Sequence, residues 1–446
     1  MKRHLAEGTV IFFSVFKWFV IAACIGIVVG FSTSLFLTLL ELFSGKTAET
    51  PFSFVLLPFA LVLTVFIIKR LAPDAEGHGT EKVIEAIHQR NGRIKLAVVP
   101  VKLTATLFTL VFGGSAGKEG PCAQIGAGLA SFFADLFKFS DENRRKLVIC
   151  GISAGFAAVF GTPIAGAIFA IEVLYIGKIL YDVMLPSFVA GIISFQTAKY
   201  LGMNYNYFEL NFDGAASHNF IFIVVAAGLF FGIVSALLIE ILKAGKTVSD
   251  GMRTNIYLKA FFIGGAMVAL SLIFGRSFFG LGLGSIREGL SGEKILWYAF
   301  AAKMLFTSMT LNFGGSGGIV TPIFFIGVTA GSLFADIFGL DRSTFAGIGM
   351  VALLAGSTNT PIASSIMAVE LFGAKISPWA ALACVISFLI TGHRSVYPSQ
   401  IIGFVKSSSI EIDTDREVDG AVPGVNFSDD SLLKKIVAFF SKKDNR

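Results

Sequence analysis

The sequence has 446 residues, of which 54% are hydrophobic and only 15% are charged, and its mean hydropathy is +0.76. Soluble domains carry about a quarter charged residues, so this composition excludes an ordinary soluble protein and is typical of a helical protein that crosses the bilayer several times. The formal net charge of +6 does not indicate nucleic-acid binding, because the basic residues lie in short loops and in the tail. We therefore expect the lipid bilayer, and no nucleic acid, as a partner.

The predicted helices of the first half begin with an apolar stretch from Val10 to Leu40, behind a short basic start. This stretch is too long for the core of a signal peptide, so we interpret it as a tilted transmembrane helix. A second apolar span runs from Pro51 to Ile68. The most polar interior segment, residues 74–95, predicts a short amphipathic helix with Thr80 as its N-cap. Further helices are expected at residues 96–112, 122–137, 147–160 (behind a charged loop at 141–146), 163–176 and 183–200.

The second half follows a polar connector, Gly202 to His218, and repeats this layout. Several of its helices are shorter than the roughly 20 residues that a full crossing needs. Short helices interrupted by Gly or Pro predict partial spans that are packed inside the protein. A polar tail, residues 406–446, contains one amphipathic stretch at 432–440. The helices are expected at residues 220–242, 258–274, 295–312, 322–338, 345–355, 361–372 and 378–390, followed by a last apolar piece at 397–405.

An internal repeat relates the two halves. The Gly-rich stretch at residues 113–121 recurs at 314–322, and flanking residues such as Lys102 and Lys303 match with the same spacing. A Thr-Pro helix start that leads to Glu172 likewise recurs before Glu370. Glycine breaks at membrane depth expose backbone amides and helix N-termini, whose partial positive charge favours an anion. In transporters built from repeats, such paired interruptions point to the binding site.

Other chemistry has little support in the sequence. The four cysteines (Cys24, Cys122, Cys150 and Cys384) lie far apart in apolar segments and are interpreted as buried free thiols. The five histidines are scattered and no HExxH motif occurs, so we expect no metal site, no cofactor and no enzymatic activity. A cation-coupled symporter would line its site with carbonyls and carboxylates, whereas helix N-termini and a single carboxylate dominate here.

Four motifs together resemble the CLC family of anion channels and anion/proton antiporters, in its bacterial form without cytoplasmic CBS domains. They are Gly-His-Gly-Thr at residues 77–80, Gly-Lys-Glu-Gly-Pro at 117–121, Gly-Ile-Val-Thr-Pro at 318–322, and Val-Tyr at 396–397. The motifs occur in the family's order, and the resemblance covers about residues 10–405. Gly-Lys-Glu-Gly-Pro is highly specific, and the other three are looser.

The resemblance implies an all-α fold of two inverted-topology repeats, built from tilted and broken helices in one transmembrane domain, 1–405. The first repeat would span about residues 10–202 and the second about 219–405, with 406–446 as a cytoplasmic tail. It also implies a homodimer with one pathway per subunit and a dimer face around 163–176 and 361–372. The protein would lie in the inner (plasma) membrane with both termini in the cytoplasm.

The resemblance also implies roles for individual residues. Glu119 matches the gating glutamate, which competes with anions and carries protons. His78 stands where the family has its central serine, so Thr80 or the backbone would supply the donor there, unless His78 faces solvent. Val173 occupies the position of the antiporters' second glutamate, and the neighbouring Glu172 points about 100° around the helix and is interpreted as structural. The expected anion-binding residues are Gly117, Lys118, Gly120, His78, Gly79, Thr80, Ile319, Val320, Thr321 and Tyr397.

The expected function is therefore the transport of a small monovalent anion, chloride first, in exchange for protons. Two alternatives stay open. An uncoupled chloride channel is one, because a valine at position 173 cannot relay protons from the cytoplasm. A fluoride/proton antiporter is the other, since Val320 and Thr321 also resemble the fluoride-exporting branch of the family.

Overall fold

The computed structural model describes residues 2–50, 52–205, 207–208, 210 and 219–425. In this part of the chain, sixteen α-helices form the molecule and three 3-10 turns and four two-residue strands connect them. The helices of the first half are α1 (Lys2–Ala48), α2 (Leu57–Leu71), α3 (Gly79–Gln89), α4 (Val98–Val111), α5 (Glu119–Leu136), α6 (Asp141–Phe160), α7 (Pro163–Glu172) and α8 (Met184–Tyr200).

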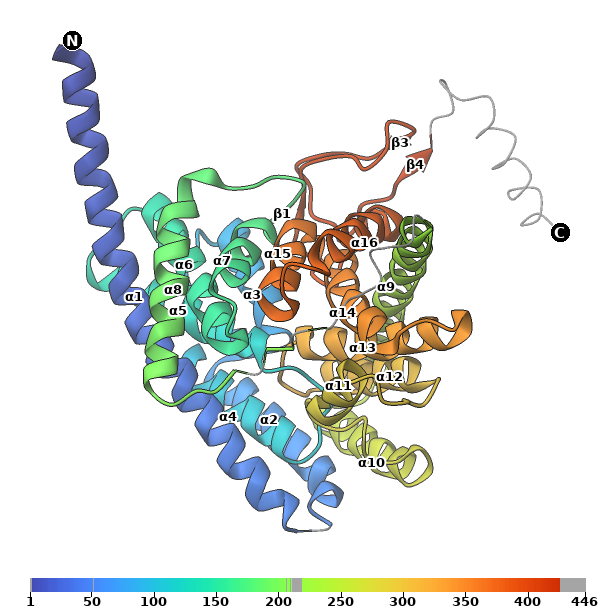
Figure 1. The fold of residues 1–446 in the computed structure, drawn as a ribbon. Helices are drawn as coiled ribbons and strands as arrows, with labels where there is room; N and C mark the ends of the chain where they lie inside the picture. The colour runs from blue at the N-terminus through green and yellow to red at the C-terminus, as the bar shows by residue number, and fades with distance from the viewer. Residues whose placement is uncertain (1, 51, 206, 209, 211–218, 426–446) are drawn as a thin grey trace.

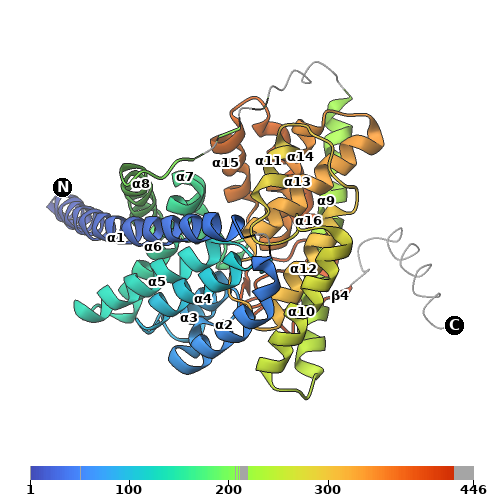
Figure 2. The same cartoon turned by 90° about the horizontal axis from the view of Figure 1, so that it is seen from below.

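The second half has the same eight helices in the same order. Within each half the equivalent helices are neighbours: α5 packs on α6 as α13 packs on α14, and α1 packs on α8 as α9 packs on α16. Figures 1 and 2 show α1–α8 gathered on one side of the molecule and α9–α16 on the other. These helices are α9 (Phe220–Gly251), α10 (Ile256–Phe274), α11 (Leu283–Leu290), α12 (Ala299–Asn312), α13 (Val320–Phe338), α14 (Arg342–Thr358), α15 (Pro361–Phe372) and α16 (Ser377–Thr391).

The outer helices are made for lipid. Among the described residues, five helical stretches are long and apolar enough to cross a membrane. Four of them belong to the outer helices α1, α2, α9 and α10, whereas the fifth, in α13, is 83% buried inside the protein. On α10, Phe262, Leu272 and Ile273 are 65%, 77% and 75% exposed. Water would penalise so large an apolar surface, whereas hydrocarbon does not. The predicted polytopic, all-α fold of two repeats is confirmed.

Helix α1 is longer than predicted. It runs from Lys2 to Ala48 instead of Val10 to Leu40, and 47 residues of helix span about 70 Å. A hydrocarbon core is only about 30 Å thick, so α1 either lies at a steep tilt or continues beyond the membrane. Its N-terminal end projects past the other helices (Figure 1).

Some local predictions were wrong. The N-cap of α3 is His78, not Thr80. Residues 141–146 do not form a loop but the first turns of α6. The partial positive charge of the helix N-terminus is stabilised there by the acidic side chain of Asp141. Instead of one more apolar element, residues 397–405 contain only the short strand β2 (Ile401–Ile402), which pairs in parallel with β1 (Tyr175–Ile176). The amphipathic stretch 432–440 lies outside the described residues.

Three smaller elements were not foreseen. Helix α11 had no predicted counterpart, and an antiparallel pair, β3 (Ile410–Glu411) with β4 (Gly424–Val425), follows the last helix.

Of the cysteines, Cys24 is exposed, contrary to the prediction, while the other three are buried. All four are free thiols.

Two glutamates join the repeats. The carboxylate of Glu172 accepts hydrogen bonds from the amides of Ile362 (3.0 Å) and Ala363 (2.8 Å) at the start of α15. Glu370 does the same for the first amides of α7, at 3.0 and 2.7 Å. Each carboxylate therefore satisfies orphan amides at the N-terminus of the other repeat's helix. The structural interpretation of Glu172 and Glu370 is confirmed.

Candidate functional site

Three helix N-termini converge where the repeats meet. The two glycine breaks are paired, because Gly117 N donates to Gly318 O and Gly318 N donates to Gly117 O, each at 2.7 Å. His78 forms a parallel bridge with Gly317 and so attaches the start of α3 to the same place. The starts of α3, α5 and α13 therefore share one small volume between the two halves.

Glycines are required for this approach. A Cβ atom on Gly79 would lie 2.1 Å from the carbonyl oxygen of Gly120. A Cβ atom on Gly120 would lie 2.9 Å from the Cα atom of Gly318. Cβ atoms essentially never come within 3.0 Å of such neighbours, so glycine lets these backbones pack together.

The three helices leave their first amides uncapped by local side chains. The N-cap residues His78, Lys118 and Ile319 make no side-chain capping hydrogen bond. Uncapped amides at a helix N-terminus carry partial positive charge and bind anions readily. Three such ends directed at one place make an electropositive centre without any ring of basic side chains.

The Glu119 carboxylate occupies this centre. Glu119 is only 2% exposed, and its Oε2 accepts the backbone amide of Thr321 at 3.1 Å. The Thr321 hydroxyl donates to the same carboxylate at 2.5 and 2.6 Å. These hydrogen bonds to Glu119 come from the other repeat, because Thr321 lies at the start of α13. The carboxylate thus places a negative charge at the positive N-terminus of α13.

Three further polar atoms near this centre lack partners. They are the hydroxyls of Tyr397 and Thr80, which are 0% and 1% exposed, and Nδ1 of the partly buried His78. None has a well-formed hydrogen bond within the described part of the chain, although Thr80 lies close enough to Tyr397 to interact with it. Buried polar atoms are rarely left unsatisfied, so this group indicates the position of a ligand. His78 does not face solvent in an exposed loop.

The other expected site residues lie at the same helix starts. Ile319 and Val320 are buried at the beginning of α13, and Lys118 is half-buried at the beginning of α5. Val173 is buried at the C-terminal end of α7, where its carbonyl accepts Nε2 of Gln400 at 2.7 Å. Nothing titratable stands at position 173, and both oxygens of Glu172 are bound by amides of α15.

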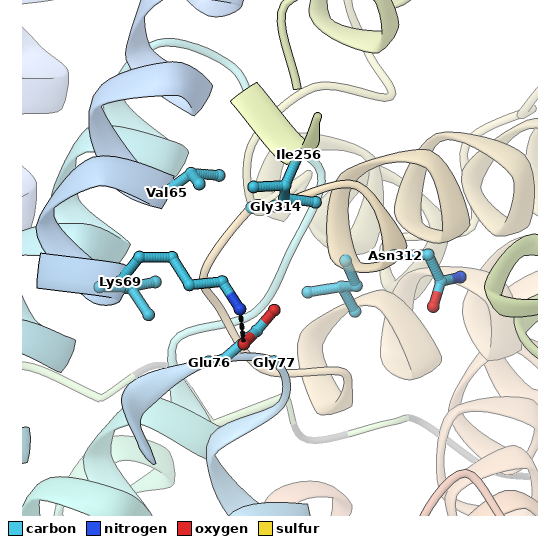
Figure 3. Close-up of a pocket in the computed structure, with 10 residues that line it drawn as sticks. Val65, Lys69, Glu76, Gly77, Ile256, Asn312 and Gly314 are labelled. Atoms are coloured by element: carbon cyan, nitrogen blue, oxygen red, sulfur yellow. Dashed lines mark hydrogen bonds and ion pairs between the residues drawn. The ribbon is translucent and has the colours of Figure 1, made fainter. Parts of the chain in front are cut away.

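Buried lysines hold the loops that lead into the site. Lys102 Nζ donates to the carbonyls of Ala75 (3.1 Å) and Gly77 (2.6 Å), directly before His78. Lys303, its repeat partner, binds two carbonyls before α11 in the same way. A pocket lies beside Gly77 and reaches Gly314, with the Lys69–Glu76 ion pair (2.7 Å) at its edge (Figure 3).

The sequence analysis missed one carboxylate, Glu81. Its Oε1 accepts the amide (3.0 Å) and hydroxyl (2.6 Å) of Ser399, two residues beyond Tyr397. Its Oε2 is buried and has no partner within the described residues. The sequence offered one indication of it. Directly after Thr80, in the motif that resembles the CLC family, a glutamate stands where that family has proline.

Serines in Gly-x-Ser-x-Gly strings do not form a hydrolase site. Ser115 and Ser316 occupy such strings, but their hydroxyls pair with Thr307 (3.0 Å) and Thr106 (3.1 Å) across the repeats. Ser153 occupies a third and donates to Ile149 O within α6. These hydroxyls hold helices together. Among the described residues, no group of three or more His, Cys, Asp and Glu could hold a metal ion.

Two inverted repeats whose broken helices meet N-terminus to N-terminus define a membrane protein of the CLC fold. The family model for voltage gated chloride channels matches residues 59–392, and the chain therefore belongs to this family. A relative from Pseudomonas syringae pv. tomato, named chloride/fluoride channel protein, is 35% identical over 401 residues and 87% of each chain. The H(+)/Cl(-) exchange transporter ClcA of Yersinia pestis is 27% identical over 338 residues, 72% of this chain and 70% of that one.

Solved structures agree with this assignment. The crystal structure of a CLC-type fluoride/proton antiporter is 26% identical and superimposes with a TM-score of 0.83, covering 87% of this chain and 98% of that one. A slow cyanobacterial Cl-/H+ antiporter, at 20% identity and a TM-score of 0.73, shares the fold over 84% of this chain and 94% of that one.

Proposed function

We propose that the protein exchanges a small halide ion for protons across the membrane, with Glu119 as gate and proton carrier. The observation that carries this proposal is the Glu119 carboxylate in the place of an anion, bound by the Thr321 amide and hydroxyl. Relatives named as exchangers of chloride or fluoride with protons support it. The family consists of transporters, and the proposed role is transport rather than catalysis.

The geometry suggests how the exchange works. An ionised Glu119 binds the start of α13 and blocks the centre. When Glu119 takes up a proton it loses the charge that holds it there, and an anion replaces it on the amides of α3, α5 and α13. The free hydroxyls of Tyr397 and Thr80 then donate to the anion. Because protonation of Glu119 and binding of the anion both favour the displaced carboxyl group, the movements of the two ions are coupled.

Chloride and fluoride are both candidates for the anion. Chloride follows from the Glu-Gly-Pro sequence after Lys118, which is of the chloride type. Fluoride is favoured by the valine and threonine at positions 320 and 321, by the relative named for both ions, and by the similarity to a fluoride/proton antiporter. Exchange is proposed ahead of an uncoupled channel although position 173 carries no carboxylate.

The surrounding organisation is part of the proposal. Residues 1–405 would form the transport domain, with repeats at about 10–202 and 219–405, and 406–446 a cytoplasmic tail. The protein would be a homodimer that uses the outer sides of α7 and α15. It would lie in the inner membrane with both termini in the cytoplasm.

Purified protein in liposomes is expected to release chloride or fluoride and to retain potassium. Helix N-termini attract anions, and acidic rings of the kind that select cations are absent from the site as described. Ion-selective electrodes would follow each ion from vesicles loaded with one salt. Potassium release comparable to halide release would contradict the proposal, and the ratio of fluoride to chloride release decides between the two anions.

A further inference from the structure

The proposed exchange needs a place for protons on the second side of Glu119, and the expected positions do not supply one. Val173 has no titratable group, and its carbonyl is bound by Gln400. Glu172 is fully engaged as the cap of α15. A proton site must therefore lie elsewhere along the route between Glu119 and the other aqueous phase.

Glu81 lies on such a route. It is in the first turn of α3, directly after Thr80, and it is partly buried. Helix α3 leads away from the centre and ends at Gln89, which donates to Glu417 (2.8 Å) in the segment after β2. Glu81 therefore stands between the anion centre and the face of the protein that carries residues 401–425.

The hydrogen bonds of Glu81 are unequal. Ser399 supplies two donors to Oε1, while Oε2 is buried and has none among the described residues. A purely structural role would explain the two hydrogen bonds from Ser399 to Oε1. It would not explain why Oε2 is buried without a donor in the described part of the chain. An ionised carboxylate requires donors, so a buried oxygen that lacks them is suited to hold a proton.

Two side chains with free hydroxyls, Thr80 and Tyr397, lie beside Glu81. Thr80 directly precedes Glu81, and Tyr397 lies two residues before Ser399, which donates to Glu81. Both hydroxyls are unpartnered, and a hydroxyl can accept a proton on one side while it donates on the other. The charged neighbours of Glu81 are Lys82 and Glu85 on its own helix, which pair with each other at 2.8 Å.

We propose that Glu81 is the second proton site of this protein and replaces the missing carboxylate at position 173. A proton from water on the face that carries residues 401–425 binds Glu81 Oε2. It then moves by way of the Thr80 and Tyr397 hydroxyls to Glu119, and Glu81 is left ionised on Ser399. This inference deepens the proposed halide/proton exchange and depends on it.

The test compares Glu81→Gln with Glu85→Gln. Glu85 is the matched control because it lies on the same helix but pairs with Lys82 and not with Ser399. Vesicles with an imposed halide gradient report halide release and proton uptake together. Glu81→Gln is expected to slow proton uptake about 100-fold while halide release continues, as for the loss of a proton-transfer group. Glu85→Gln should leave both fluxes unchanged.

The outcomes separate the two claims. If the wild type and Glu81→Gln exchange halide for protons equally well, the proposed role of Glu81 is wrong but the proposed exchange stands. A wild type that moves halide without protons would overturn the exchange, and the role of Glu81 with it. Loss of both fluxes in folded Glu81→Gln would show that Glu81 serves the anion path and would also overturn the inference.

A second variant reads the proton site even where Glu81→Gln does not fold. Ser399→Ala keeps the carboxylate but removes one donor to its charged form. Removing that donor raises the proton affinity of Glu81, so the pH profile of proton uptake should shift to higher pH. An unshifted profile in Ser399→Ala would contradict the inference.

Discussion

Replacing Glu119 with alanine is expected to abolish halide-driven proton movement and to leave halide flux intact or faster. The carboxylate is the group that lies at the start of α13, where it accepts hydrogen bonds from the amide and the hydroxyl of Thr321. Alanine removes both the proposed block and the proposed proton carrier. Proton and halide fluxes from the same vesicles, measured with a pH electrode and a halide electrode, check this result.

Glu119→Gln separates charge from bulk, since the glutamine amide keeps the size but cannot carry a proton. It should also lose coupling, and the pH dependence of halide flux should disappear in both variants. Glu293→Gln, at an exposed position between α11 and α12, is the matched control. Unchanged coupling and pH response in Glu119→Ala would show that the gate has been assigned to the wrong residue.

A single methyl group on Gly79 is expected to disable transport. In Gly79→Ala the new Cβ atom would meet the Gly120 carbonyl at 2.1 Å, so α3 and α5 must separate. Overpacking of this kind costs about 1–3 kcal/mol, and here the displacement falls on the amides proposed to bind the anion. Halide flux should drop by at least about tenfold, which is the effect of 1.4 kcal/mol on one step.

Gly284→Ala provides the control for Gly79→Ala. Gly284 lies near the start of α11, the helix of the second repeat that corresponds to α3, and a Cβ atom there meets nothing within 4 Å. It should fold and transport like the wild type. Normal halide flux in Gly79→Ala would mean that the approach of α3 to α5 is not needed for the anion path.

The repeat was predictable because its marks are local and come in pairs. The Thr-Pro start and the glycine at position 373 set both ends of α15, which agree with the prediction of residues 361–372. Helix starts marked by charge were harder, since the acidic turn at Asp141 resembles a loop when only hydrophobicity is counted. Helix α11, eight residues with two glycines, gives no periodic signal.

The centre of the site could be predicted only in part. Residues 117–121 and 318–322 are recognisable in sequence, but the bond from Thr321 to Glu119 depends on how the two breaks meet. Thr80 is a residue type that often serves as an N-cap, but α3 already begins at Gly79. Its hydroxyl therefore caps no amide and is left without a partner among the described residues. Ser399 is far from Glu81 along the chain, so no local pattern could reveal that contact.

The most direct test of the account is the movement of protons against their gradient. Vesicles that hold wild-type protein are given a halide gradient and no initial pH difference. Their internal pH should change as halide flows, and the reversal potential should depend on both ions. That result is predicted if Glu119 binds protons and its carboxylate competes with the halide for one site. Halide flow that sets the membrane potential alone, with no uphill proton movement, would contradict exchange and indicate a channel.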